Sequence, residues 1–409
     1  MVPGKHREAM SLHCRADDYL YNYTPNRITR QMKHRLLTLC LIAIIALATA
    51  DSFGQGKVTR PAKKPTQQST KPRKKPTKPQ RHQGGGGQDN RPTIIKEGQY
   101  PKTITEVKIP NSVKTIGDYA FRSFDFLRSV EIPNSVTTIG KEAFAWCVSL
   151  NSVNIPSSVT TIGNSAFSHC ALATVNIPRS VTTIGRGAFW GCKSLTTVTI
   201  PNSISILDGT FGFCESLKSI VIPESVTVIK KDAFTSCTSL PYINIPMSVQ
   251  YIEAGAFDYC SNLNAFYGKF ATPDNRCLVV NGTLVGFAPL GLYIYQIPNS
   301  VKVIGEKTFY GVHELNRIDI PNSVTSIEEN AFAYCTSLDK VVLPSSIISI
   351  GKFAFTGCDA LESIAIPRSI EEIDSGAFSD CKSLKVVHIP KNCKIYSDSF
   401  PKWCGIIRY

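Results

Sequence analysis

Apolar and polar residues alternate in a pattern that returns every 22 or 23 residues along most of this 409-residue chain. The unit reads L-x-x-V-x-I-P-x-S-V-T-x-I-G-x-x-A-F-x-x-C-x-x. In one copy Val130 and Ile132 take one side of the chain while Ser129 and Glu131 take the other, which predicts a short, half-buried strand. Stacked copies would place these strands side by side in a parallel sheet.

An Ile-Pro or Leu-Pro dipeptide marks the period. Because proline lacks an N–H group, it fits only where the pairing of a strand stops. The prolines are Pro110, Pro133, Pro156, Pro178, Pro201, Pro223, Pro246, Pro298, Pro321, Pro344, Pro367 and Pro390. Their spacing is 22 or 23 residues except for one gap of 52. A fixed period in the twenties predicts a solenoid.

The rest of the unit predicts a second extended piece and a turn. Val136 and Ile139 should face inward from this piece, and the serine before Val136 suits a backbone bond at the turn. Gly140 would help the chain turn, but other units carry Asp, Lys or Glu there, so a left-handed conformation is not expected. The A-F-x-x-C segment predicts a short helical or 3₁₀ turn that sends Phe and Cys into the core.

Each unit has one apolar side that it cannot cover alone, so only stacking on further copies gives a core. The prediction is an α/β repeat, a solenoid of short parallel strands, turns and short helical or 3₁₀ segments over residues 93–409. About 13 units at roughly 4.8 Å per strand step would make a rod about 60 Å long.

This unit closely resembles the BspA-like type of leucine-rich repeat, common in bacterial surface proteins of the Bacteroides group. The resemblance covers about residues 103–400. Departures are Phe124 and Val312 in place of Cys, Thr-Phe at 210–211 and 308–309, and one interruption. The resemblance implies a leucine-rich-repeat solenoid.

The interruption predicts an insert at 264–296. Asn281-Gly282 stands between two apolar runs, a strong hairpin signal. The alternative is a pair of degenerate repeats, since 52 residues are two periods plus six. Asp274, Asn275 and Arg276 are candidates for a recognition loop, because inserts in repeat arrays often form a binding edge.

The N-terminal 92 residues differ in composition from the repeats. Residues 1–31 are an overcalled start or disordered, and 32–50 read as a signal peptide with a basic start, a short apolar stretch and Ala48-Thr49-Ala50; an uncleaved anchor is the alternative. Residues 51–92 predict a disordered basic linker rich in Pro, Lys and Gly. The linker either contacts an anionic envelope or is a solvated spacer.

The net charge of +14 is concentrated in this front end. Residues 1–92 hold 18 Lys+Arg and 5 Asp+Glu, whereas the rest of the chain holds 27 and 26. A protein that binds nucleic acid should carry its basic surface on the folded domain. The nearly neutral repeat region therefore argues against nucleic-acid binding.

Nine cysteines follow the repeat phenylalanine by three residues, which predicts a ladder of reduced, buried thiols that pack as small apolar groups. They are Cys147, Cys170, Cys192, Cys214, Cys237, Cys260, Cys335, Cys358 and Cys381. Parallel Cβ directions do not favour bridging along the ladder. Cys393 and Cys404 in the last unit are candidates for a disulfide that would pin the end of the array.

No pattern indicates an enzyme, a metal site or a cofactor. His169 precedes Cys170, but it lies at a variable position beside a ladder cysteine, and no orienting partner is indicated. Glu371 and Glu372 are adjacent and would diverge on a strand. The sequence lacks a C-x-x-C pair, a G-x-S-x-G motif and a phosphate-loop glycine pattern.

The outward rows of the sheet are the candidate binding surface, since solenoid sheets commonly present extended surfaces. Asn154, Asn176 and Asn244 with Tyr242 are predicted to form a polar patch with one aromatic anchor. In the more charged C-terminal half, the candidates are Arg317 and Asp319. An ordinary hydrated face is the alternative.

The resemblance implies an exported, non-enzymatic, adhesin-like protein, secreted or at the cell surface or periplasm, that binds a protein or glycan on host or bacterial surfaces. The alternative is a periplasmic or secreted scaffold that binds a bacterial protein or a glycan. A hydrolase within the insert is a third, weaker class. No cofactor is expected.

Overall fold

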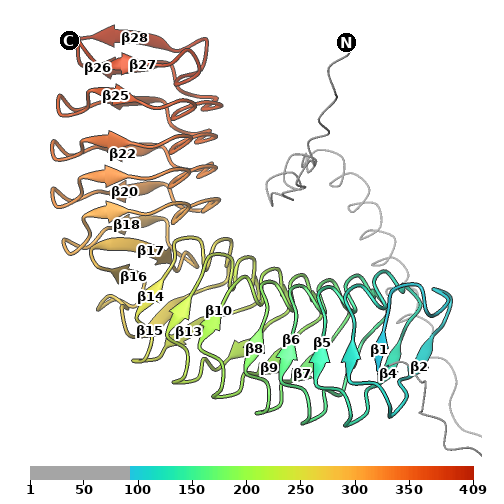
Figure 1. Cartoon of the computed structure of the whole chain (residues 1–409). Helices are drawn as coiled ribbons and strands as arrows, with labels where there is room; N and C mark the ends of the chain where they lie inside the picture. The colour runs from blue at the N-terminus through green and yellow to red at the C-terminus, as the bar shows by residue number, and fades with distance from the viewer. Residues whose placement is uncertain (1–92) are drawn as a thin grey trace, which may run out of the picture. The chain divides into compact units, whose positions relative to one another are not determined.

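The structure, a computed structural model, describes residues 93–409. They form a parallel-strand β-solenoid of about 14 turns, which confirms the leucine-rich-repeat solenoid (Figure 1). The predicted segments 1–31, 32–50 and 51–92 lie outside the described residues. The described residues contain no apolar helix of the length needed to cross a membrane.

The first row of strands is built from the V-x-I part of the unit. Its strands are β2 (Glu106–Lys108), β4 (Ser129–Glu131), β7 (Thr174–Asn176), β9 (Thr197–Thr199), β11 (Ser219–Ile220), β13 (Tyr242–Ile245), β15 (Ala265–Gly268), β18 (Ile294–Gln296), β20 (Arg317–Asp319), β22 (Lys340–Val342), β24 (Ser363–Ala365), β26 (Val386–Ile389) and β28 (Gly405–Arg408). Paired strands run parallel, and Val107 aligns with Val130. Both valines are buried between exposed neighbours, as the alternation predicts.

The second row is built from the T-x-I part. Its strands are β1 (Ile94–Ile95), β3 (Thr115–Ile116), β5 (Thr138–Ile139), β6 (Thr161–Ile162), β8 (Thr183–Ile184), β10 (Ile206–Leu207), β12 (Val228–Ile229), β14 (Tyr251–Ile252), β17 (Thr283–Phe287), β19 (Val303–Ile304), β21 (Ser326–Ile327), β23 (Ser349–Ile350), β25 (Glu372–Ile373) and β27 (Lys394–Ile395). Val136 and Ile139 are fully buried, as predicted.

The A-F-x-x-C segment is not helical, which corrects the expected helical or 3₁₀ turn; residues 93–409 contain no helix. Backbone N–H groups alternate in direction instead. Phe121 donates to the carbonyl of Ala143 in the next unit (2.8 Å), whereas Arg122 donates back to Tyr119 (3.1 Å). Tyr119 and Ser123 take positive φ values to allow this. A helix would keep all of these donors inside the segment, so stacking between units outweighs the local preference.

A column of phenylalanine rings fills the core along each array. Consecutive rings lie nearly parallel with centroids 5.1–6.0 Å apart from Phe121 to Phe257, and 4.8–5.2 Å apart from Phe309 to Phe400. The predicted inward position of the repeat phenylalanine is thereby confirmed.

The nine ladder cysteines are buried free thiols, and they do more than fill space. Each sulfur lies 3.0–3.4 Å from the carbonyl oxygen of the repeat phenylalanine in the preceding unit, as for Cys147 and Phe121. The thiol therefore supplies a weak hydrogen-bond donor that alanine or valine lacks. Cysteine suits this position because it is small, mostly apolar and still able to donate.

The repeat serine also joins one unit to another. The Ser158 hydroxyl donates to the carbonyl of Val136 at 2.6 Å, and six further units repeat this bond at 2.5–2.8 Å. The bond expected within the unit's own turn is thus made to the preceding unit.

The repeat glycine is needed for close approach. A Cβ at Gly163 would lie 2.6 Å from the backbone of Gly140, and φ at Gly163 is outside the left-handed region. The expectation that this position is not left-handed agrees with the structure. Where Asp, Lys or Glu replaces the glycine, the stack accommodates a side chain.

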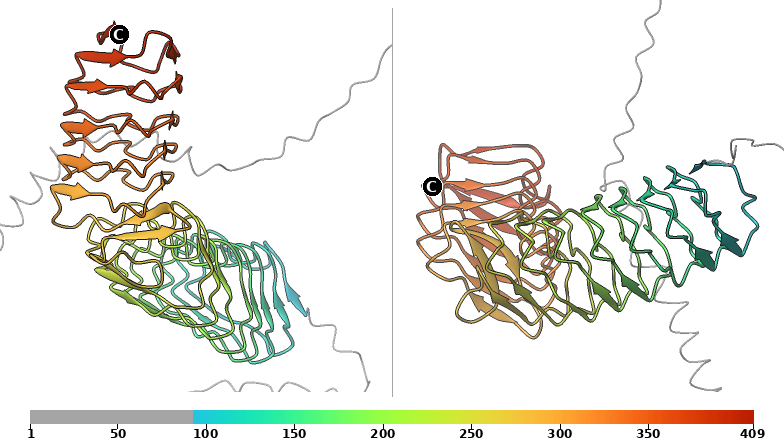
Figure 2. Two further views of the ribbon diagram at one scale, coloured as in Figure 1. Left: turned by 90° about the vertical axis from the view of Figure 1, so that its left-hand side faces the viewer. Right: turned by 60° about the horizontal axis from the view of Figure 1, so that its bottom comes forward.

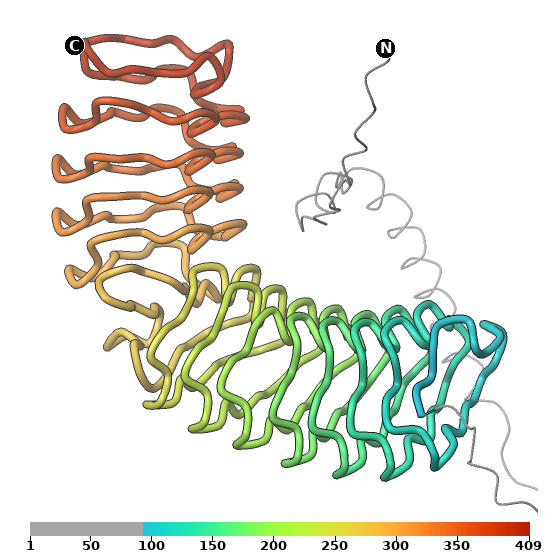
Figure 3. Tube along the Cα trace, viewed as in Figure 1, coloured from blue at the N-terminus to red at the C-terminus, as the bar shows by residue number. Residues whose placement is uncertain are grey.

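A β-hairpin interrupts the array. Strands β16 (Cys277–Val280) and β17 pair antiparallel, and both Asn281 and Gly282 have positive φ, as a tight I′ turn requires. Thr283 of β17 then pairs with Val303 of β19. The stack changes direction at this hairpin (Figures 2 and 3).

The hairpin serves two cores at once. Leu278 and Val280 belong to the apolar cluster of the units before it, whereas Leu284 and Phe287 belong to the cluster of the units after it. This explains why both strands are almost continuously apolar, since neither face meets water.

Candidate functional site

The exposed face of β13 and β15 carries the strongest aromatic feature of the first row. The two strands pair parallel, with Tyr242 opposite Ala265 and Asn244 opposite Tyr267. Tyr242 and Tyr267 are 53% and 44% exposed, and their ring centroids lie 6.0 Å apart in an edge-to-face arrangement. A polar amide and two accessible phenol rings therefore share one rigid piece of sheet.

An exposed aliphatic side chain extends this surface toward the N-terminus. Val221 follows β11 in the row that continues through Asn244 to Tyr267, and it is 80% exposed. We call Val221, Tyr242, Asn244 and Tyr267 the tyrosine patch. Large apolar groups held on a rigid surface in this way mark interaction sites more often than isolated ones do.

The structure separates the asparagines that the sequence grouped with Tyr242. Asn154 and Asn176 are exposed and lie in consecutive units, with Asn176 on β7 and Asn154 outside the assigned strands. The units of Thr199 and Val221 stand between them and Asn244. Only Tyr242 and Asn244 of the predicted four are therefore together.

Arg317 and Asp319 form an ion pair along strand β20. The Nε and Nη2 atoms of Arg317 each lie 2.9 Å from Oδ1 of Asp319. The pair is largely exposed, so it contributes little to stability. It presents a locally neutral surface beside Ile294 and Lys340 on the neighbouring strands.

Sequence reasoning missed Tyr267. It lies in the interrupted stretch, where the 23-residue register could not assign it to a row. The alternation in Ala-Phe-Tyr-Gly at 265–268 was the available signal, since buried Phe266 implies an outward Tyr267.

The three loop candidates of the insert are used by the fold itself. The carboxylate of Asp274 accepts hydrogen bonds from Thr272 Oγ1, the Arg276 backbone and Tyr295 Oη. Burial alone would raise the pKa of Asp274, but these three bonds outweigh it and the pKa is lowered. The backbone N–H and C=O of Asn275 bond Thr272 and Phe266.

Arg276 completes this internal network. Its Nη1 atom donates to the carbonyls of Ala288 and Leu290 at 3.3 and 3.1 Å, which fixes the chain after the hairpin. The loop therefore orders the bend.

His169 and Cys170 are not arranged as a nucleophile and its base. The His169 ring stacks on Trp146 with centroids 3.8 Å apart, and burial together with Lys193 lowers its pKa. Burial raises the pKa of the Cys170 thiol well above its ordinary value, and its sulfur bonds the carbonyl of Phe144. Both shifts oppose a thiolate–imidazolium pair.

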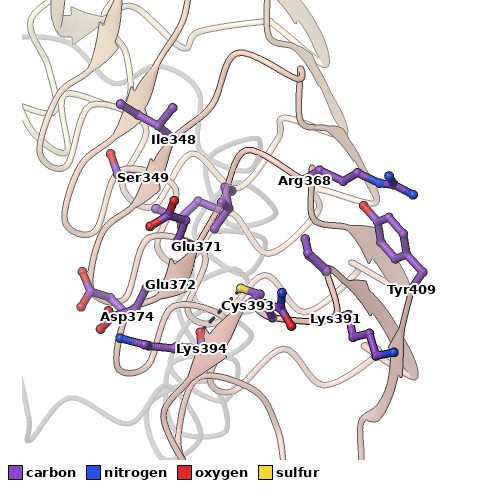
Figure 4. Close-up of a pocket in the computed structure, with 14 residues that line it drawn as sticks. Ile348, Ser349, Arg368, Glu371, Glu372, Asp374, Lys391, Cys393, Lys394 and Tyr409 are labelled. Atoms are coloured by element: carbon purple, nitrogen blue, oxygen red, sulfur yellow. Dashed lines mark hydrogen bonds between the residues drawn. The ribbon is translucent and has the colours of Figure 1, made fainter.

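The largest pocket found in the described residues, about 860 Å³, opens over the last units (Figure 4). Glu371, Glu372 and Asp374 line one side of it, and Lys391 and Lys394 line the other. The Glu372 carboxylate accepts a bond of 2.6 Å from Tyr396 Oη. Within residues 93–409, no group of three or more His, Cys, Asp or Glu side chains is suited to hold a metal ion.

Cys393 and Cys404, near this pocket, are free thiols in the structure. The sulfur of Cys393 lies 3.6 Å from the carbonyl oxygen of Lys394, and that of Cys404 lies 3.7 Å from the carbonyl oxygen of Gly405. Their pairing stays a prediction that depends on the redox state of the protein.

Comparison with known proteins supports the repeat assignment. The family model described as BspA type leucine rich repeat region, with six copies, matches residues 93–208, 137–264 and 287–406. A search of curated proteins finds no significant match.

Solved structures share the fold over most of the chain. A leucine-rich repeat protein from Bacteroides ovatus is 30% identical, with 77% of this chain and 87% of that chain covered and a TM-score of 0.50. A leucine rich cell surface protein from Faecalibacterium prausnitzii is 33% identical, with 75% and 88% covered and a TM-score of 0.67. Repeat, core and relatives agree, and the chain belongs to the BspA-type leucine-rich repeat family.

Proposed function

We propose that this protein is a non-enzymatic binding protein of the bacterial cell surface, and that it holds a protein ligand on the tyrosine patch. The observation that carries the proposal is the pair of exposed rings, Tyr242 and Tyr267, fixed on paired strands with Asn244 between them. Tyrosine is enriched at the energetic centres of protein interfaces because it offers a large apolar ring and a polar tip.

Rigidity supports this role. The strands beneath the patch hold Ile243, Ile245 and Phe266 in the core, so the rings are positioned before a ligand arrives. A preformed surface loses less conformational entropy on binding than a mobile loop does. This matches a solenoid that works through a fixed face.

The location at the cell surface is supported by two observations. The segment 32–50 has the pattern of a signal peptide, and the relative from Faecalibacterium prausnitzii is named a cell surface protein. The runner-up is a periplasmic or secreted scaffold that binds a bacterial protein or a glycan. Protease treatment of intact cells distinguishes these locations, since only a surface protein is cleaved without lysis.

Adhesion of the purified full chain to immobilised extracellular-matrix proteins tests the binding role. Tyr242→Ala together with Tyr267→Ala should reduce retention at least tenfold, because two central aromatic contacts are worth about 2 kcal/mol or more. Tyr251→Ala is the matched control, since Tyr251 is a similarly exposed tyrosine on the second row. Equal loss in the control, or no loss in the double variant, contradicts the proposal; retention on immobilised glycans instead would favour the runner-up.

A further inference from the structure

The turn segments on either side of the hairpin contact each other at the bend. Nζ of Lys231 lies 2.8 Å from Oε1 of Glu306, although 75 residues separate them in the chain. Close by, the rings of Tyr259 and Tyr310 pack with centroids 4.9 Å apart. These contacts join the units before the hairpin to those after it, where the stack changes direction (Figure 1).

Asp258 lies inside this contact. Its side chain is half-buried beside Tyr259, and its backbone carbonyl accepts bonds from Thr235 Oγ1 and the Ser236 N–H. Among the described residues, no hydrogen bond or ion pair within bonding distance reaches its carboxyl oxygens. A carboxyl in such a place is costly to ionise, because no donor replaces the water that it has lost.

Charges of both signs face Asp258 from the two sides of the bend. Lys307 and Lys231 favour its ionised form, whereas Asp232 and Glu306 oppose it. Further charged groups face Asp232 itself: Arg186, Lys231, Lys307 and Glu253. Lys231 and Lys307 also contact Glu306, at 2.8 and 3.7 Å, so neither lysine is free to neutralise Asp258 alone.

We propose that Asp258 is a pH-dependent latch on the bend: while its carboxyl is uncharged the two turn faces stay packed, and its ionisation loosens the contact between them. The bend would then be firm under mildly acidic conditions and more open under alkaline ones. The latch acts on the shape of the solenoid and does not depend on the identity of any ligand.

The direction of the effect follows from linkage. Burial, countered in part by Lys307, raises the pKa of Asp258 from 3.8 to about 8. The closed bend therefore binds a proton that the opened bend releases between pH about 4 and about 8. Over this range, rising pH favours opening, by up to about tenfold per pH unit if opening fully hydrates the carboxyl.

Hydrogen exchange of the full chain, read by mass spectrometry and corrected for the intrinsic pH dependence of exchange, tests the latch. Peptides that cover 231–236, 256–260 and 305–311 should show an opening equilibrium that grows at least tenfold from pH 6 to pH 8. Peptides from 138–147, far from the bend, serve as the internal reference and should not change.

Two variants make the test specific. Asp258→Asn should abolish the pH dependence at the bend while Asp359→Asn, a change at an acidic residue of the later units, leaves it intact. Lys307→Ala removes the main charge that favours ionisation, and should shift the opening to higher pH. A wild-type bend whose exchange follows the reference peptides, or an Asp258→Asn protein that keeps the dependence, overturns the proposal.

Discussion

The units before the hairpin, residues 93–264, and those after it, residues 294–409, are built from one repeat but packed differently. Phe189, Phe211 and Phe234 have centroids 5.8 and 6.0 Å apart, whereas Phe332, Phe355 and Phe378 lie 4.9 and 5.1 Å apart. Backbone pairing holds neighbouring strands at about 4.8 Å in both arrays. Wider ring spacing therefore means that the earlier units diverge on the phenylalanine side.

The length of the units offers a reason. The wider spacings begin where two repeats have 22 residues, between Pro156 and Pro178 and between Pro201 and Pro223, whereas every later unit has 23. A missing residue shifts the turn segment against its neighbours while the strands stay in register. The core thus tolerates small changes in unit length, at the cost of looser ring contacts.

The exposed rows differ between the arrays more than the cores do. Thr174, Asn176 and Thr197 give the earlier face a neutral polar surface, whereas Arg317, Asp319 and Lys340 make the later face charged. Because both arrays share the same inward residues, the fold leaves the outward ones free to vary. Differences in binding between the arrays should therefore reside in the exposed rows.

Removal of one ring from each column should give the largest effect. Phe211→Ala and Phe355→Ala should each lower the free energy of unfolding by about 3–5 kcal/mol, because a fully buried ring leaves a cavity. The loss should be greater at Phe355, whose neighbours lie closer. Urea unfolding followed by circular dichroism measures both; Val148→Ala, at an exposed position, is the control. A smaller loss at Phe355 would contradict the role given to ring spacing.

A change at the hairpin should affect both arrays. Gly282 has φ of 83°, so Gly282→Ala imposes backbone strain of about 1–2 kcal/mol, while a Cβ there meets only the Lys302 side chain. Hydrogen exchange should then increase in peptides on both sides of the hairpin. Gly405→Ala, at a glycine outside the left-handed region, is the control. An effect confined to one array would show that the hairpin does not couple them.

The thiols should differ in reactivity with little effect on stability. Burial raises the pKa of Cys192 and Cys335 to about 12, so at pH 8 only about one in ten thousand of these thiols is ionised. Alkylation of the native protein, mapped by mass spectrometry, should label Cys404 and spare the ladder. Labelling of the ladder should grow as pH rises toward 12. Loss of Cys404 labelling until a reductant is added would indicate the predicted disulfide with Cys393.

The repeat could be predicted from the sequence because its signal is redundant. The positions of Val130, Ile132, Phe144 and Cys147 recur in many copies, so strand direction, inward rows and parallel stacking follow from periodicity alone. The Asn281-Gly282 hairpin could also be predicted, since a I′ turn has strong local preferences. Local and periodic features are readable because each residue's role depends on its near neighbours.

The turn segments, the bend and the complete tyrosine patch depended on tertiary structure. The A-F-x-x-C segment is not helical because half of its donors bond the next unit, which a single unit cannot reveal. Tyr267 reached Asn244, and Glu306 reached Lys231, only after the hairpin had set the spacing of the chain around it. The sequence by itself determined what each unit buries, whereas contacts between units, and across their interruption, arise from stacking and have no local signature.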